Sequence, residues 1–178
     1  MAVVIGARQT GKSTLVQSLP LLASHAYRTL DDPELRIQAR QDPASVLAFA
    51  RTLILDEVQR APDLLSAVKQ AVDRDRPRAP GRYVLTGSAN LLLMERISES
   101  LAGRAAYIRL WPLTRRERLG LGRAGIWSEL LHAPAQDGEY LVKEQEVPAD
   151  DWQVLVREGG LPVPAYELRT AAETRAVV

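Results

Sequence analysis

The chain has 178 residues, of which 46% are hydrophobic, and this is enough apolar surface for a sizeable core in a protein of ordinary domain size. Its formal net charge of +1 argues against a dominant polyanion-binding surface, and the absence of cysteine excludes disulfides and thiolate metal sites. No apolar run approaches the roughly 18 residues of a membrane span, and the N-terminus lacks a signal-type segment. We therefore expect no membrane partner and a cytoplasmic location.

Short apolar runs alternate with helical patterns as far as Trp111, which is typical of a parallel α/β sheet. The predicted strands are Ala2–Ile5, Ala26–Leu30, Thr52–Leu55, Arg82–Leu85 and Ala105–Leu110. The predicted helices between them are Lys12–Leu19, Pro33–Arg40 after the N-cap signal Asp31-Asp32, Pro43–Ala50, a helix capped by Asp63, and Asn90–Ala102. With right-handed crossovers, five such strands form a doubly wound α/β sheet with helices on both faces.

Beyond Trp111 the hydrophobic pattern loosens. Short helices are predicted at Arg115–Leu119, Ile126–Leu131 and Asp150–Val156, and Gly159-Gly160-Leu161-Pro162 breaks the chain after them. We therefore expect a core domain over residues 1–116 and a C-terminal extension over residues 117–178.

The eight residues after the first predicted strand match the P-loop pattern. They read Gly6-Ala7-Arg8-Gln9-Thr10-Gly11-Lys12-Ser13. In such a loop the glycines let backbone N–H groups surround a β-phosphate at the start of a helix. Lys12 is placed to bridge the β- and γ-phosphates of ATP, Ser13 to offer its hydroxyl to Mg²⁺, and Thr14 is a candidate contact of the α-phosphate. A strand before the loop and a helix after it are the context this motif requires, which favours phosphate binding over a chance turn.

A second acidic motif follows the third predicted strand. Leu53-Ile54-Leu55-Asp56-Glu57 is a buried run with two acids at its carboxyl end, as in a Walker B strand. Asp56 is the candidate Mg²⁺ ligand and Glu57 the candidate general base that polarises the attacking water. Alone, the pattern would indicate a buried strand and two solvated acids, but the complete P-loop upstream favours the functional interpretation.

The fourth predicted strand ends in Thr86-Gly87-Ser88-Ala89-Asn90. A polar residue at this point contacts the γ-phosphate or the attacking water in NTPases with a strand inserted between the two Walker elements. Ser88 is the better candidate, because Asn90 is equally well explained as the cap of the next helix.

Taken together, these blocks resemble a known family. The P-loop is followed in order by Leu30-Asp31-Asp32-Pro33-Glu34, Ile54-Leu55-Asp56-Glu57-Val58-Gln59-Arg60-Ala61-Pro62, Leu85-Thr86-Gly87-Ser88-Ala89-Asn90 and Ser98-Glu99-Ser100-Leu101-Ala102-Gly103-Arg104. The order and content resemble prokaryotic AAA+-superfamily ATPases of the archaeal-ATPase type, over residues 2 to 116. The resemblance implies a P-loop NTPase core with five strands in the order 5-1-4-3-2. It also implies that the chain is a truncated member, with residues 117–178 the start of a second domain.

Arg104 has two interpretations. An arginine at the end of a helix after the fourth strand acts in some NTPases as a sensor, or as a finger that reaches a neighbour's γ-phosphate. Alternatively, Arg104 is structural and pairs with Glu99 or caps its helix. Spacing alone does not show how far the side chain reaches, so both interpretations stay open.

The motifs predict an ATPase that hydrolyses Mg²⁺-ATP and couples hydrolysis to a protein partner, a further domain or a second copy of the chain. The alternative is a nucleotide-dependent switch or interaction module with little turnover. A nucleic-acid partner has weaker support. Glu117 interrupts an arginine group, which favours a solvated face; its members are Arg109, Arg115, Arg116, Arg118 and Arg123.

Overall fold

The computed structural model describes residues 1–75, 81–88, 101–118, 126–138, 141 and 152–167. The chain divides into two compact units, Met1–Trp111 and Pro112–Val178. The domain boundary that the sequence predicts after residue 116 stays a prediction.

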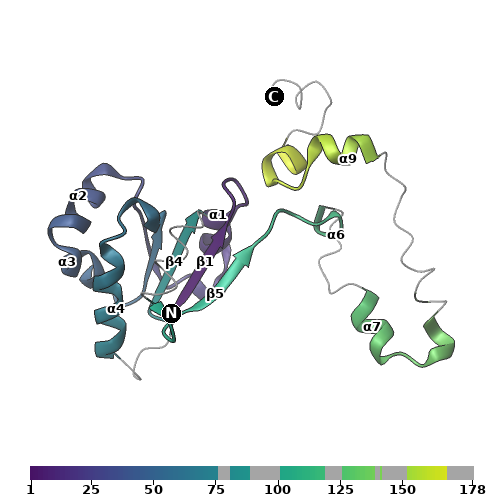
Figure 1. Ribbon diagram of the computed structural model, residues 1–178, viewed down its shortest axis with the longest axis horizontal. Coiled ribbons are helices and arrows are strands. Elements are labelled where there is room, and N and C mark those ends of the chain that lie inside the picture. Colours follow the sequence, from purple (N-terminus) through teal and green to yellow (C-terminus); the bar gives the residue numbers. More distant parts are fainter. Residues whose placement is uncertain (76–80, 89–100, 119–125, 139–140, 142–151, 168–178) are drawn as a thin grey trace. The chain divides into compact units, whose positions relative to one another are not determined.

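The first unit is built on a five-stranded parallel sheet (Figure 1). Its strands are β1 (Ala2–Gly6), β2 (Ala26–Thr29), β3 (Leu53–Asp56), β4 (Tyr83–Ser88) and β5 (Ala106–Leu110). They lie in the order β2-β3-β4-β1-β5, which confirms the predicted order 5-1-4-3-2 counted from the opposite side. Because all strands are parallel, their carboxyl ends meet at one edge of the sheet, and Gly6, Asp56 and Ser88 lie there.

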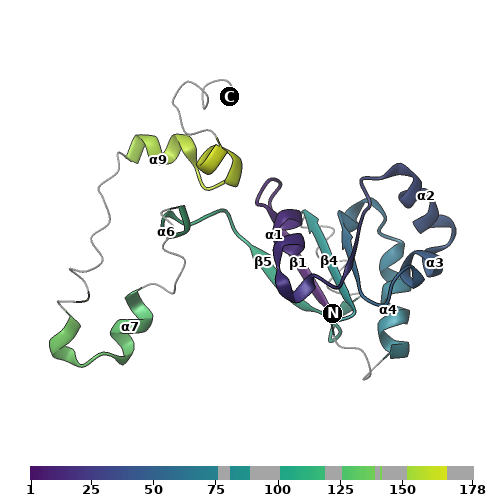
Figure 2. The same cartoon turned by 180° about the vertical axis from the view of Figure 1, so that it is seen from behind.

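Helices cover both faces of this sheet. They are α1 (Lys12–Ser18), α2 (Pro33–Gln41), α3 (Pro43–Ala48) and α4 (Leu64–Asp75), with short 3₁₀ turns η1 (Pro20–Leu22) and η2 (Val58–Arg60). Side chains of a strand alternate between faces, so Val3 and Ile5 pack with α2, α3 and α4, whereas Val4 packs with Val16 of α1. Seen from behind, α1 lies in front of the sheet (Figure 2).

Helices α2 and α3 begin where the sequence signals predict. The Asp32 carboxylate accepts a hydrogen bond from the Glu34 N–H at 2.9 Å, and the Asp42 carboxylate accepts one from the Ser45 N–H at 3.1 Å. In each case a proline occupies the first helical turn, where its missing N–H costs nothing. Each such cap stabilises a helix by about 1 kcal/mol. The helix predicted over Asn90–Ala102 lies almost entirely outside the described residues.

The described helices of the second unit are short. They are α6 (Arg115–Arg118), α7 (Ile126–His132), the 3₁₀ turn η3 (Ala135–Asp137), α9 (Trp152–Glu158) and the π-helical turn η4 (Val163–Glu167). Thr114 and Glu117 form a capping box: the Thr114 N–H donates to the Glu117 carboxylate at 2.7 Å, and the Glu117 N–H donates to the Thr114 hydroxyl at 3.2 Å. The Thr114 hydroxyl also donates to this carboxylate at 2.8 Å, and the hydrogen bonds from the Thr114 N–H and hydroxyl hold the pKa of Glu117 below its ordinary value.

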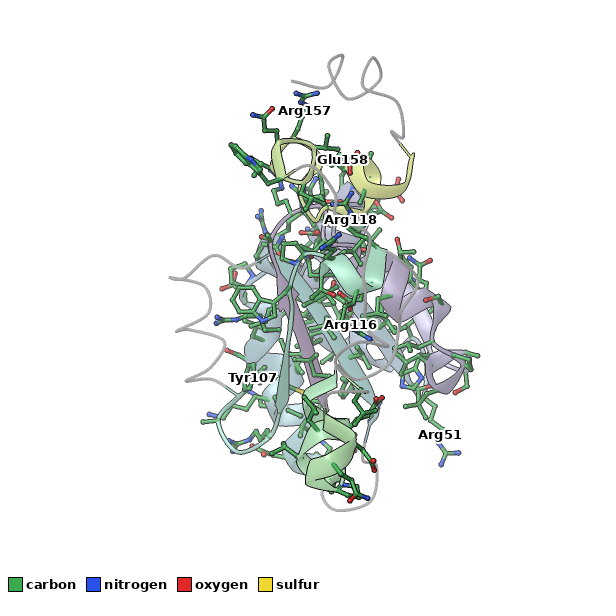
Figure 3. The ribbon with its side chains drawn as sticks, turned by 90° about the vertical axis from the view of Figure 1, so that its right-hand side faces the viewer. Arg51, Tyr107, Arg116, Arg118, Arg157 and Glu158 are labelled. Atoms are coloured by element: carbon green, nitrogen blue, oxygen red, sulfur yellow. The ribbon has the colours of Figure 1, made fainter. Side chains whose placement is uncertain are left out.

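Helices α6 and α9 are joined by an ion pair between Arg118 and Glu158 (Figure 3). Just beyond α9, the Leu113 N–H donates to the Gly160 carbonyl at 2.6 Å. A Cβ at Gly160 would lie 2.5 Å from the Leu113 carbonyl oxygen, so only glycine allows this approach of the two backbones. Within the described residues no helix is long and apolar enough to cross a membrane.

Candidate nucleotide site

The loop between β1 and α1 has the backbone geometry of a phosphate cradle. Gln9 and Gly11 both adopt positive φ, at 63° and 83°, and Gly11 is the N-cap of α1. Gly6 must be a glycine because a Cβ there would collide with the Leu110 carbonyl oxygen of β5. The chain therefore turns tightly between strand and helix and brings the positive N-terminus of α1 to the carboxyl edge of the sheet.

Lys12 is held inside this loop rather than in solvent. Its side chain is 5% exposed, and its ammonium donates to the Ala7 carbonyl at 2.7 Å. The Thr10 hydroxyl donates to the same carbonyl at 2.9 Å. The loop thus encloses one positive charge at the centre of its own turn, where a phosphate oxygen would compete with the Ala7 carbonyl for the ammonium. Arg8 and Thr14 are exposed.

Asp56 ends β3 as a buried carboxylate that is 3% exposed. Three donors surround it. The Thr86 hydroxyl of β4 donates to one oxygen, the Glu57 N–H donates to the same oxygen at 3.1 Å, and the Tyr27 hydroxyl of β2 donates to the other oxygen at 2.5 Å. Neighbouring strands on both sides therefore orient this acid, which is what a rigid metal ligand requires.

Tyr27 is a neutral donor to the buried acid. Partial burial, together with the hydrogen bond and negative charge of Asp56, raises the pKa of Tyr27 above its ordinary value. The phenol therefore keeps its proton and donates it to the Asp56 carboxylate, so a residue of β2 orients the acidic end of β3.

Glu57 is held in an unusual backbone conformation, with φ of 57° and ψ of 42°. Its carboxylate accepts a hydrogen bond from the side-chain amide of Gln59. The oxygen of that amide accepts the Ser88 N–H at 3.3 Å, and Ser88 lies opposite Gly6 in the β1–β4 register. The predicted base and the predicted γ-phosphate contact are therefore at the same edge of the sheet as the P-loop, and Gln59 links them. Asn90 lies outside the described residues.

Arg104 is placed at the other edge. It precedes β5, where Ala106 pairs with Ala2, whereas the P-loop begins at the opposite end of β1. Its guanidinium forms two hydrogen bonds with Asp73, at 2.6 Å and 2.9 Å, which raise the pKa of Arg104. A third hydrogen bond reaches the Ala102 carbonyl at 3.1 Å. The structure does not bring Arg104 to the phosphate loop of its own chain, and the carboxylate it binds belongs to α4 rather than to Glu99, which lies outside the described residues.

Three residues that surround the predicted site were missed by sequence reasoning: Tyr27, Thr86 and Gln59. The position of Thr86 could have been inferred from the sequence, because the predicted strand order puts the end of β4 beside Asp56. No local spacing marks Tyr27. Gln59 stands two residues after Glu57 in the Asp-Glu-Val-Gln-Arg block, where only the turn η2 brings its amide back to the carboxylate.

The predicted arginine group draws its members from both units. Arg109 belongs to the first unit and stacks over the Trp111 ring, with 5.3 Å from guanidinium to ring centroid. Arg118 belongs to the second unit and pairs with Glu158. Arg123 lies outside the described residues. Within the part of the chain that the structure describes, no group of three or more His, Cys, Asp or Glu side chains gathers as a metal site.

Residues 1–119 match the family model described as an AAA domain. The chain belongs to this AAA-domain family. The match confirms the AAA-type ATPase family predicted from the sequence blocks, and the observed sheet confirms its P-loop fold.

Two curated relatives are uncharacterized proteins of Mycobacterium tuberculosis and Mycobacterium bovis. Each is 38% identical to the chain over 120 residues, covering 66% of the chain. The chain spans about a quarter of their length (26%). Among solved structures, AMPPCP-bound DnaA from Aquifex aeolicus has a similar fold, with a TM-score of 0.50 and 14% identity. That alignment covers 92% of this chain and 52% of DnaA.

Proposed function

We propose that this AAA domain binds Mg²⁺-ATP and hydrolyses it to ADP and phosphate. The observation that carries the proposal is the burial of Lys12 and Asp56, 5% and 3% exposed, at the carboxyl edge of one parallel sheet. The two predicted metal ligands, Ser13 and Asp56, come from different elements, 43 positions apart in the sequence (56 − 13), and these elements are α1, which begins at this edge, and β3, which ends at it. A hydroxyl and a carboxylate suit Mg²⁺, which takes few protein ligands and completes its shell with water and phosphate oxygens.

The phosphates would lie in the loop after β1. Backbone N–H groups at the start of α1 and the buried Lys12 ammonium supply positive charge for the β- and γ-phosphates. Ser13 and Asp56 would hold the metal, which when bound neutralises charge on the phosphate oxygens. The fold shared with an AMPPCP-bound protein supports a nucleotide as the ligand.

Glu57 is the proposed base. In hydrolysis a water oxygen bonds to the γ-phosphorus, the bond from that phosphorus to the β–γ bridging oxygen breaks, and the water proton passes to the Glu57 carboxylate. Ser88, at the end of β4, is the proposed contact of the γ-phosphate or of the attacking water. Coupling of this reaction to a protein partner, to a further domain or to a second copy of the chain is part of the same proposal.

Phosphate release from Mg²⁺-ATP by the wild-type chain and its Glu57→Gln variant tests this function. We expect turnover to fall about 10²-fold or more in the variant while ATP affinity is kept, because a positioned base contributes roughly 10²–10⁴-fold. Glu34→Gln, an exposed acid in the first turn of α2, is the matched control and should keep full turnover. ATP binding without turnover in either protein would instead favour a nucleotide-dependent switch.

A further inference from the structure

Gln59 contacts two parts of the candidate site at once. It lies in η2, directly after the acidic end of β3. Its amide nitrogen donates to the Glu57 carboxylate, and its amide oxygen accepts the Ser88 N–H at 3.3 Å. The two contacts fix the orientation of the amide, because turning it over would place its oxygen against the carboxylate and its N–H₂ against the backbone N–H.

The end of β4 is shaped to receive this amide. A Cβ at Gly87 would lie 2.9 Å from the Gln59 amide oxygen, closer than real Cβ contacts come. No positive φ demands glycine at this position, so the reason for its small size is the approach of Gln59 rather than the backbone conformation. The turn η2 and the end of β4 therefore contact each other through Gln59, Gly87 and Ser88.

We propose that Gln59 is a positioning residue that ties the Glu57 carboxylate to the end of β4, so that the base and the residue proposed to meet the γ-phosphate keep a fixed geometry. The proposal rests on the proposed ATP hydrolysis and deepens it. Glu57 has a left-handed backbone conformation, which costs free energy unless the surrounding contacts compensate for it. From its position in η2, the Gln59 side chain contacts both the Glu57 carboxylate and the β4 backbone.

A double-mutant cycle tests the coupling. Gln59→Ala removes the bridge, and Gly87→Ala displaces it without altering either Gln59 or Glu57. We expect each single variant to lower kcat by about 10-fold to 100-fold, since a misplacement of about 1 Å near the chemistry has effects of that size. KM for ATP should change by less than about threefold, because Lys12 and the loop are untouched.

The double variant carries the discriminating result. Without the Gln59 side chain nothing opposes a Cβ at position 87, so the double variant should match Gln59→Ala alone. Additive losses would mean that Gly87 acts independently of the bridge, and they would overturn the proposal. Gln41→Ala, an exposed glutamine at the end of α2, is the control and should behave as wild type.

The same measurements separate this proposal from the proposed function. Loss of turnover in Glu57→Gln with wild-type turnover in Gln59→Ala would refute the role of Gln59 and leave hydrolysis intact. Absence of turnover in the wild type would refute hydrolysis itself. The contact is also visible by NMR without any reaction: the Gln59 side-chain amide protons should exchange slowly and shift on Glu57→Ala, and an amide that behaves like that of Gln41 would contradict the bridge.

Discussion

The two edges of the parallel sheet are formed by the same strands but differ in how their polar side chains are exposed. At the carboxyl edge polar groups are buried. Apart from tyrosine, the buried polar or charged side chains among the described residues are Thr10, Lys12, Asp56 and Thr86, and all four lie there, whereas the Tyr83 hydroxyl is buried at the amino edge. At the amino edge, Arg104 pairs with Asp73 and Arg82 with Asp75 in solvent-accessible positions.

Backbone strain follows the same division. Among the described residues other than glycine, Gln9 and Glu57 are those with positive φ, and both belong to the carboxyl edge. Buried polar groups and left-handed backbone each cost free energy unless the surroundings compensate, and their concentration at one edge marks a place kept for function. Partly exposed ion pairs such as those of the amino edge contribute little and tie elements together. The comparison predicts that variants at the carboxyl edge change ligand binding and chemistry, whereas variants at the amino edge do not.

The largest expected effect at the carboxyl edge, apart from loss of the base, comes from Lys12→Ala. The variant removes the enclosed ammonium and should weaken ATP binding by about 100-fold, since a charge-assisted contact contributes roughly 1.5–3 kcal/mol. Isothermal titration with Mg²⁺-ATP measures it. Lys69→Ala, on α4, is the matched control and should bind as wild type. Unchanged ATP affinity in Lys12→Ala would show that the P-loop does not bind the nucleotide.

Thr86→Val tests whether the buried acid depends on its neighbours. The substitution keeps the side-chain shape but removes the donor to Asp56 and the acceptor of the Glu57 N–H. We expect the free energy of unfolding to fall by about 1–3 kcal/mol, because buried polar groups lose a partner. Half-saturation by Mg²⁺ in the ATPase assay should also rise. Denaturant unfolding with an unchanged m-value would attribute the loss to the folded state, and full stability would show that Asp56 does not need the threonine.

Much of this edge follows from local sequence, and the rest does not. The P-loop and the acids after β3 could be predicted because each motif is a short run whose spacing carries its own mechanism. The sheet was predictable from apolar runs and helix caps such as Asp32. The predicted strand order brings Thr86 near Asp56, but the role of Tyr27 depends on the register of β2 and β3, and the role of Gln59 depends on the turn η2. Asp73, the partner of Arg104, is 31 positions away from it, and no motif in the sequence indicates that the two residues pair.

Tyr27→Phe should have a smaller effect, because it removes one hydroxyl and leaves the ring. We expect the Mg²⁺ requirement for ATP binding to change by a few fold and the free energy of unfolding to fall by about 1 kcal/mol. The raised pKa of Tyr27 adds a pH signature. A group that keeps its proton longer when folded stabilises the protein below the unfolded pKa, near 10.0, and this contribution is lost as pH rises through the folded pKa. Stability should therefore decline less steeply above pH 10 in Tyr27→Phe than in wild type, with Tyr83, another tyrosine of raised pKa, common to both. Equal slopes of stability against pH in the two proteins would show that the Tyr27 hydroxyl does not interact with Asp56.

The smallest effect is expected at the amino edge. Arg104→Ala breaks the pair with Asp73 but leaves the P-loop and the acids of the carboxyl edge in place, so turnover and ATP affinity should stay within about twofold of wild type, as for exposed ion pairs generally. Asp73→Asn is the matched partner variant, and each should lower the thermal midpoint only slightly. The alternative role, a finger that reaches a neighbouring copy, makes a different prediction: wild-type turnover per chain would rise with protein concentration, and Arg104→Ala, but not Asp73→Asn, would abolish that rise. If turnover does not depend on protein concentration and the two variants behave alike, Arg104 is a structural residue that links α4 to the start of β5. Its position at the amino edge, far along β1 from the P-loop, would then explain why it takes no part in the reaction.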